Sequence, residues 1–358
     1  MNDPHELDTE THDASGNVAR RMLLGGAVLG TALAAMSVRA TQARAAGFPA
    51  HPKWKLVFVN HVTTNPFFVP TRYGIEDACA LLGCEYQWTG SATSNAAEMV
   101  NAMNTAIAGK ADAIAVPIVD QAAFNRPIAS AMEAGIAVFS YNADVPSAGR
   151  LAYIGQDLYA SGAKMGERIL GMIDSGRVAL FIATPGQLNI QPRIDGAQDV
   201  IRKAGRNITV DVIATGPTVD EELSKIDAYY IGHQDVKGMF AVDAGSTQGV
   251  SQVIKKYKLP EKGIKGGGYD LLPVTLNNIR DGFLDFTIDQ QPYLQGFYTV
   301  MVMATFLASG GLVGPADINT GLKFVTKDSV GPYITTSTRY EGKTDRPMIV
   351  PRSGAIKG

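Results

Sequence analysis

The sequence predicts an α/β protein built from two doubly wound lobes, each a parallel sheet with helices on both faces, joined by a multi-strand hinge. Short runs rich in Val, Ile and Phe alternate with longer stretches in which apolar residues recur every three or four positions. This alternation occurs twice along the chain, with no linker rich in Pro, Gly or Ser between the two series. The length of 358 residues also suits two domains of roughly 150 residues each.

The first series of elements begins with the apolar run 56–59, which predicts a buried strand. A helix is expected over 71–82, where apolar residues fall on one face and Gly83 supplies a stop. The next helix is expected to begin at Asn95, which is placed to form a capping box with Glu98. The other elements of this series are expected at 86–88, 113–118 and 138–141 for strands and at 122–134 for a helix.

The second series repeats the same pattern. Strands are expected at 177–183, 209–213, 238–242, 264–269 and 285–289. Helices are expected at 160–173, 193–204, 220–232, 245–257, 273–281 and 293–309. The polar, turn-rich end of the chain adds one edge strand at 322–325 and then a loose tail. We expect a first lobe of 53–154 plus 291–318, a second lobe of 155–290 plus 319–345, and a tail of 346–358.

Residues 1–45 are expected to be a removable export signal rather than part of the fold. A polar start is followed by Arg20 and Arg21, a short glycine-diluted apolar run at 22–36, and the small-residue site Ala-Arg-Ala at 43–45. Paired arginines before such a run are typical of the twin-arginine export route, so the mature protein is expected in the periplasm. An uncleaved membrane anchor is disfavoured, because the run is shorter than the ~20 apolar residues that span a bilayer.

The composition argues against several other kinds of protein. Lys and Arg number 32 and Asp and Glu 34, so the net charge of −2 offers no basic face for nucleic acid. Five histidines without a zinc-binding motif predict no metal site. The glycines 266–268 lie inside a predicted strand and match no dinucleotide motif, so we expect the protein to bind no cofactor. The sequence also shows no catalytic Ser/His/Asp order, so we do not expect an enzyme. A monomer is expected. Cys79 and Cys84 are equally consistent with a disulfide and with buried free thiols.

Polar and aromatic side chains follow the carboxyl ends of the predicted strands, where ligands bind in parallel sheets. In the first lobe these are His61, Asn65, Phe67, Phe68, Asn142 and Asp144. In the second lobe they are Arg193, Asp243, Asp270 and Gln290. Carboxylates and amides accept hydrogen bonds, Arg donates in a planar fork, and aromatic rings offer flat apolar faces. This set suits a small neutral molecule with many hydroxyl groups, such as a sugar or polyol.

The motifs resemble those of a type I periplasmic sugar-binding protein of the ribose- and galactose-binding kind, over nearly all of residues 53–325. The most specific stretch is Asn-Pro-Phe-Phe at 65–68, directly after the first strand. Gly-Tyr-Asp at 268–270 and the stretch Phe-Thr-Ile-Asp-Gln-Gln-Pro at 286–292 stand in the same frame. The resemblance implies the two-lobed type I fold and a ligand held between the lobes.

The resemblance also implies roles for individual residues. Asn65 and Phe68 would hold the sugar, and Arg193 would donate to its ring or anomeric oxygen. The other contacts that the resemblance implies come from Asp243, Asp270 and Gln290, with His61 at a position that contacts the ligand in some members. Ribose binders carry Asp-Arg where this chain has Asn142 and Ala143, so one strong donor is missing and we expect a ligand other than ribose.

Several of these residues also have structural interpretations. Asp243 and Asp270 suit the N-caps of the helices that follow them, and Asp144 suits a surface turn. His61 is equally consistent with a structural histidine, and Arg193 with a surface ion pair. Core packing is the alternative for the two adjacent phenylalanines.

The expected function is a solute-binding protein that captures a monosaccharide or polyol between two closing lobes and delivers it to the membrane permease of an ABC importer. Binding that reports to a chemoreceptor is a compatible alternative. A doubly wound enzyme is disfavoured by the missing motifs. A transcriptional regulator would need a helix-turn-helix at the N-terminus, where the export signal stands instead. The acids Asp243 and Asp270 leave an amino sugar open as a ligand.

Overall fold

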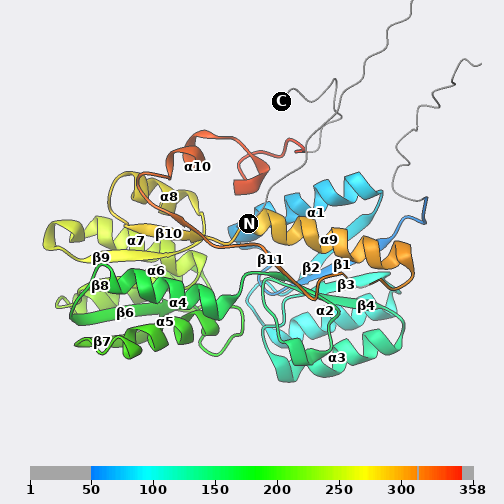
Figure 1. Cartoon of the computed structure of the whole chain (residues 1–358), viewed down its shortest axis with the longest axis horizontal. Coiled ribbons are helices and arrows are strands. Elements are labelled where there is room, and N and C mark those ends of the chain that lie inside the picture. The colour runs from blue at the N-terminus through cyan, green and yellow to red at the C-terminus, as the bar shows by residue number, and fades with distance from the viewer. Residues whose placement is uncertain (1–49, 313, 349–358) are drawn as a thin grey trace, which may run out of the picture. The chain divides into compact units, whose positions relative to one another are not determined.

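The computed structural model describes residues 50–312 and 314–348. Within them the chain forms two six-stranded sheets, each flanked by helices, which confirms the predicted α/β class with two doubly wound lobes (Figure 1). The predicted export signal and most of the predicted tail lie outside the described residues. No helix in the described part of the chain has both the length and the apolar character needed to cross a membrane.

The first lobe holds a sheet with strand order β11-β5-β4-β3-β1-β2, in which all strand pairs are parallel. Its strands are β1 (Lys55–Asn60), β2 (Glu85–Gly90), β3 (Ala113–Val116), β4 (Ala137–Tyr141), β5 (Tyr153–Gly155) and β11 (Asp317–Asn319). Its helices are α1 (Val69–Leu82), α2 (Ala96–Ala108), α3 (Gln121–Glu133) and α9 (Pro292–Ser309). Strand residues alternate between two cores: Leu56 and Phe58 pack with α1 and α9, whereas Val57 and Val59 pack with α2 and α3.

The second lobe holds a sheet with strand order β12-β10-β9-β8-β6-β7, in which only the edge strand β12 is antiparallel. Its strands are β6 (Gly176–Ile182), β7 (Ile208–Ala214), β8 (Gly238–Ala241), β9 (Lys265–Tyr269), β10 (Phe286–Asp289) and β12 (Lys323–Val325). Its helices are α4 (Leu158–Leu170), α5 (Gln191–Lys203), α6 (Val219–Gly232), α7 (Ala244–Lys256), α8 (Pro273–Arg280) and α10 (Gly331–Thr335). Val178 and Leu180 pack with α4 and α5, and Ala179 and Phe181 pack on the opposite face with α6 and α7.

Two helix pairs approach so closely that only glycine fits between them. A Cβ atom on Gly162 of α4 would lie 2.1 Å from the carbonyl oxygen of Arg193 in α5. A Cβ atom on Gly74 of α1 would lie 2.1 Å from the carbonyl oxygen of Tyr293 in α9. Larger residues would push both pairs apart. The first contact fixes the position of the helix turn that carries Arg193.

Within the described residues the chain passes from one sheet to the other three times, after β5, after β10 and after β11. The Thr320 N–H donates to the Gly155 carbonyl at 2.9 Å, and Thr320 Oγ1 donates to the Gln290 carbonyl at 3.0 Å. Gln156 Nε2 donates to the Gly321 carbonyl at 3.1 Å. These hydrogen bonds tie the three crossings to one another, as expected for a multi-strand hinge.

The differences between predicted and observed elements have local causes. The strands β5 and β11 are missing from the prediction, because three residues carry too little of a periodic pattern. The strand predicted over 113–118 ends at Val116, because Pro117 has no N–H to donate to the ladder. The predicted edge strand at 322–325 is confirmed as β12, paired with β10.

The end of the described chain packs more closely than the expected loose tail. Arg339 begins the 3-10 turn η4 (Arg339–Glu341) and is only 3% exposed. Its Nη2 lies 2.5 Å from Glu76 Oε2, and its Nε lies 3.2 Å from Asp77 Oδ2. Both acids belong to α1, so η4 packs on the first lobe, whereas the predicted division places 319–345 in the second.

Exchange of Arg339 for lysine is expected to lower the free energy of unfolding by about 1–2 kcal/mol. Lysine keeps the charge, but it loses the planar fork between two carboxylates and the stacking of the guanidinium over the Tyr73 ring, 4.0 Å away. Chemical denaturation would measure the loss, with Arg346→Lys at an exposed position as the matched control. Equal stability of the two variants would show that η4 is not held by this pairing.

Cys79 and Cys84 are both buried and free in the structure, which favours the thiol alternative over a disulfide. Burial raises the pKa of the Cys79 thiol to about 12. At neutral pH Cys79 is therefore protonated and a poor nucleophile.

Candidate ligand-binding cleft

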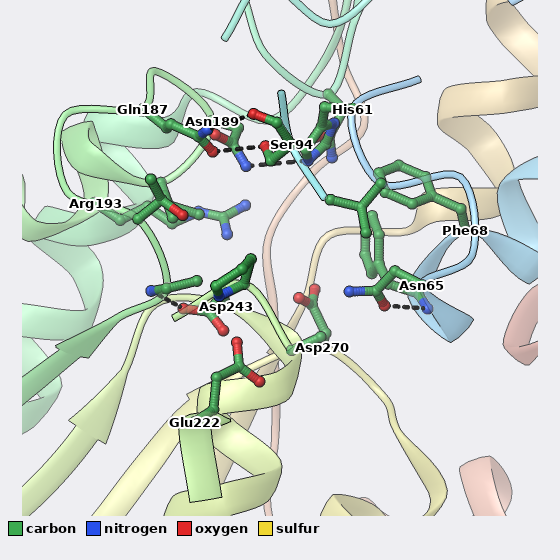
Figure 2. A pocket seen from close by; sticks show the side chains of 18 of the residues that line it. His61, Asn65, Phe68, Ser94, Gln187, Asn189, Arg193, Glu222, Asp243 and Asp270 are labelled. Carbon is green, nitrogen blue, oxygen red and sulfur yellow. Dashed lines mark hydrogen bonds between the residues drawn. The ribbon is translucent and has the colours of Figure 1, made fainter. Parts of the chain in front are cut away.

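A cleft lies between the two lobes and encloses about 590 Å³ of space, part of it open to solvent (Figure 2). Side chains from the carboxyl ends of strands in both sheets line it. The structure brings together nine of the ten residues predicted for the site: His61, Asn65, Phe67, Phe68, Asn142, Arg193, Asp243, Asp270 and Gln290.

Asp144 is the predicted contact that lies elsewhere. Its Oδ2 lies 2.6 Å from Arg150 Nη2 and its Oδ1 accepts from Arg150 Nε at 3.0 Å, so the two groups form a bidentate pair. Ser140 Oγ donates to the same carboxylate. Asp144 is not among the residues that line the cleft, and its carboxylate is satisfied by Arg150, so the structure does not support the prediction that it binds the ligand.

The loop after β1 presents Asn65 and two phenylalanines to the cleft. Asn65 caps the 3-10 turn η1 (Pro66–Phe68), since its Oδ1 accepts from the Phe67 N–H at 2.9 Å. The Phe67 and Phe68 rings meet edge to face with their centroids 4.7 Å apart. Both rings are buried in the first-lobe core and also line the cleft, so core packing and ligand contact are compatible.

His61 lies at the end of β1 and joins the two lobes. Its Nε2 is 3.2 Å from Asn189 Nδ2, and its Nδ1 has no hydrogen-bond partner among the described residues. Burial lowers the pKa of His61 to about 3, so the imidazole is neutral at physiological pH. Packing of the ring against Phe68, with centroids 5.2 Å apart, gives His61 a structural role as well.

The lobes also touch along the loop that follows β6. Ser94 Oγ donates to Gln187 Oε1 at 2.8 Å, and Gln187 Nε2 donates back to the Ser94 carbonyl at 3.1 Å. The Leu188 N–H donates to the Val119 carbonyl at 3.0 Å. These hydrogen bonds join the first lobe to the second beside the cleft.

A chain of hydrogen bonds runs through the cleft from one lobe to the other. Asn142 Nδ2 donates to Gln295 Oε1 at 3.2 Å, and Gln295 Nε2 donates to Gln290 Oε1 at 3.2 Å. The same Gln290 oxygen accepts from Arg193 Nη2 at 3.0 Å, and Gln290 Nε2 donates to Asp270 Oδ1 at 2.7 Å. Gln290 thus sits at the hinge and orients side chains from both lobes.

Arg193 is buried, 2% exposed, rather than paired on the surface. Its Nη1 donates to the Val242 carbonyl at 2.8 Å, and its guanidinium carbon lies 4.2 Å from the centroid of the Tyr269 ring. The surface ion-pair alternative is therefore wrong. The protein holds this guanidinium in a fixed plane, which is what directional recognition of an oxygen requires.

Asp270 follows β9, where the chain turns sharply out of the sheet. Its φ of 75° is left-handed, as is the φ of 64° at Asn142 after β4. The helix α8 is capped by Leu272, so the capping alternative is wrong for Asp270. Burial raises the pKa of its carboxyl to about 7, although the nearby Arg193 guanidinium opposes the change.

Asp243 does cap a helix. Its Oδ1 accepts from the Ser246 N–H in the first turn of α7 at 2.8 Å, and its Oδ2 accepts from the Ala183 N–H after β6 at 2.9 Å. Glu222 of α6 lies beside it. Burial and the charge of Asp243 raise the pKa of Glu222 to about 10, so Glu222 is uncharged at neutral pH.

Five polar residues that line the cleft are absent from the sequence prediction: Ser94, Thr184, Gln187, Asn189 and Glu222. Thr184 lies two residues beyond β6, and Ser94, Gln187 and Asn189 lie in loops several residues beyond a strand, where the strand-end criterion does not reach. Glu222 lies in a helix, and its local signal is the acidic run 220–222 at the start of α6. Acidic residues are favoured at a helix start by the helix dipole alone, so that signal does not indicate a ligand site.

No group of His, Cys, Asp and Glu side chains in residues 50–312 and 314–348 is arranged to hold a metal ion.

A family model described as a periplasmic binding protein domain matches residues 56–311. The chain therefore belongs to the periplasmic binding protein family. It is a binding protein and not an enzyme, in agreement with the resemblance that its motifs indicate.

Relatives and solved structures refine this placement. The chain is 55% identical over 327 residues to XylF, a xylose/arabinose-binding protein of Sulfolobus acidocaldarius, and the match covers 87% of this chain and 80% of that protein. It is 25% identical to an ABC transporter solute-binding protein of Burkholderia graminis solved in complex with D-arabinose, with a TM-score of 0.74 over 79% of this chain and 98% of the other. GanP, a glucose-galactose binding protein of Geobacillus stearothermophilus, shares the fold at 24% identity, with a TM-score of 0.72 over 78% of this chain and all of that one.

Proposed function

We propose that the protein binds a monosaccharide in the cleft, with xylose and arabinose as the first candidates. The observation that carries the proposal is a set of buried polar atoms, all in residues that line the cleft, without a hydrogen-bond partner among the described residues. They are His61 Nδ1, Asn189 Oδ1, Arg193 Nε and Glu222 Oε2. An unpaired buried polar group costs roughly 1–3 kcal/mol, and a ligand with several hydroxyl groups is suited to pair with such atoms.

The remaining lining supports a neutral sugar over a strongly charged ligand. Arg193 is the one Lys or Arg side chain among the described lining residues, and two of its nitrogens already donate to protein oxygens. The rings of Phe67 and Phe68 give an apolar surface for the carbon face of a pyranose. The names of the relatives, a xylose/arabinose-binding protein and a protein solved with D-arabinose, point to the same class of ligand.

The mechanism that we propose is closure of the first lobe on the second, with the ligand bridging them. The ligand favours the closed form because it contacts both lobes only there. The protein would be exported to the periplasm through the twin-arginine signal at 1–45 and would act there as a monomer. It would then deliver the sugar to the permease of an ABC importer.

Isothermal calorimetry with the mature chain is expected to give one saturable site for D-xylose or for L- or D-arabinose. Affinity in the micromolar range corresponds to about −8 kcal/mol, which several paired hydroxyl groups and an aromatic face are sufficient to supply. D-ribose is expected to bind more weakly, because the donor that ribose binders carry is Ala143 here. The same measurement extends to a panel of pentoses, hexoses and polyols, and the proposal fails if none of them binds.

A further inference from the structure

Glu222 forms part of the second-lobe wall of the cleft. Its side chain is 4% exposed, and it lines the cleft together with Asp243 and Asp270. Figure 2 shows its carboxyl group directed into the space toward those two acids. Its Oε2 atom has no hydrogen-bond partner among the described residues. A buried, unpartnered carboxyl oxygen at this place needs an explanation beyond the fold itself.

Asp243 holds the negative charge of this pair. Both of its oxygens accept backbone N–H groups, from Ser246 and Ala183, and it stands at the N-terminus of α7, where a negative charge is favoured. Two adjacent buried carboxyl groups strongly resist ionising together. The proton of the pair therefore resides on Glu222.

The other charged groups around the pair do not change this assignment. Glu221 on the same helix repels a charge on Glu222. Asp270 is a further acid that lines the cleft, and the guanidinium of Arg193 donates to the Val242 carbonyl and to Gln290. An ionised Glu222 would be a third acid facing a single guanidinium.

The helix that faces Glu222 leaves room for its carboxyl group. A Cβ atom on Gly245, in the first turn of α7, would lie 1.7 Å from Glu222 Oε2. Glycine is unfavourable within a helix compared with alanine. Its presence here fits a site in which the Glu222 carboxyl must be accommodated against the start of α7.

We propose that Glu222 is a ligand-binding residue that meets the sugar as a neutral carboxylic acid, and that the cleft therefore favours a neutral sugar over an amino sugar. The inference rests on the proposed function. A protonated carboxyl can direct its O–H to Asp243, with which the Glu222 side chain interacts, and offer its other oxygen to a ligand hydroxyl. An ionised Glu222 would instead favour a cationic ligand.

The test compares Glu222→Gln and Glu222→Ala by calorimetry at pH 7 with D-xylose and L-arabinose. Glutamine keeps the size and neutrality of the group, so affinity is expected to fall only about threefold. Alanine removes the polar partner, so affinity is expected to fall about 10-fold to 100-fold. Glu221→Gln, the same substitution at an exposed neighbour outside the cleft, is the matched control and is expected to bind like the wild type. D-glucosamine is expected to bind no more tightly than D-glucose.

Infrared difference spectra of wild type minus Glu222→Gln supply a readout that needs no ligand. The carbonyl band of a protonated carboxyl is expected at pH 7, and its absence would show that Glu222 is ionised. Equal affinity of Glu222→Ala and wild type would overturn the ligand contact. A large loss of sugar affinity in Glu222→Gln with an unchanged melting temperature would show that Glu222 does not act as a neutral acid. Tighter binding of D-glucosamine than of D-glucose would show the same. If the wild type binds none of the sugars, the proposed function itself fails, a result distinct from these.

Discussion

Arg193→Ala is expected to weaken sugar binding by at least about 100-fold and to lower the free energy of unfolding by about 3 kcal/mol. The substitution removes the donor to the Val242 carbonyl and the cation stacked on Tyr269. It also removes one of the two donors to Gln290, which orients Asp270. Because the guanidinium opposes the raised pKa of Asp270, its loss is expected to raise that pKa further.

Arg193→Lys and Arg202→Ala separate the possible causes of such a loss. Lysine retains the charge without the planar fork, so this variant is expected to fold and to bind about 10-fold more weakly than the wild type. Arg202 lies on the same helix with a side chain that is 74% exposed, and its replacement is expected to change stability by less than about 0.5 kcal/mol. Calorimetry and denaturant unfolding measure both quantities. If a folded Arg193→Ala variant bound the sugar with wild-type affinity, Arg193 would not be a ligand-binding residue.

His61 and Asp270 are expected to give the stability of the protein two opposite dependences on pH. In an unfolded chain His titrates near pH 6.5 and Asp near pH 4. Between these values the unfolded chain holds a proton on His61 that the fold lacks, because burial lowers that pKa to about 3. The His61 contribution therefore makes stability rise with pH. The fold in turn holds a proton on Asp270, whose pKa is about 7, so that contribution makes stability fall with pH.

The His61 and Asp270 contributions are each on the order of 4 kcal/mol across their intervals, so these two are expected largely to cancel each other. Glu222, which the fold also keeps protonated, adds a contribution that falls with pH in the wild type and in both variants. Relative to the wild type, the unfolding free energy of Asp270→Asn is therefore expected to rise with pH from about pH 4 to 6.5. His61→Gln is expected to show the reverse slope. Denaturant unfolding as a function of pH measures these slopes, and Asp174→Asn, at a side chain 97% exposed, should parallel the wild type. Parallel curves for all the variants would contradict the buried titrations.

Most elements of both sheets could be predicted because their patterns are local. The apolar run at 56–59 and the apolar face of 71–82 correspond to β1 and α1, since burial on one face repeats every two or every 3.6 residues. The packing of η4 on α1 could not be predicted in this way. It depends on Arg339 meeting Glu76 and Asp77, which lie more than 260 positions earlier in the chain.

The site could be predicted in part for a similar reason. Parallel strands bring their carboxyl ends to one edge, so side chains such as Asn65 and Gln290 could be assigned to a common cleft from sequence position. The same criterion selected Asp144, whose carboxylate pairs with Arg150 instead. It also missed Glu222, which reaches the cleft from a helix.

The sequence by itself determined the two-lobed α/β plan, the family and nine of the residues that line the cleft, because periodicity, turn residues and strand-end motifs are short-range properties of the chain. Only the tertiary structure decided which acid pairs with which donor and where the protons lie. Asp243, Asp270 and Glu222 are carboxylic acids of similar intrinsic acidity. One is bound by two backbone N–H groups, one lies beside a guanidinium, and one is buried next to a negative charge. The pKa values of the three acids differ because each has its own degree of burial and its own neighbouring charges, and these are fixed only when the chain has folded.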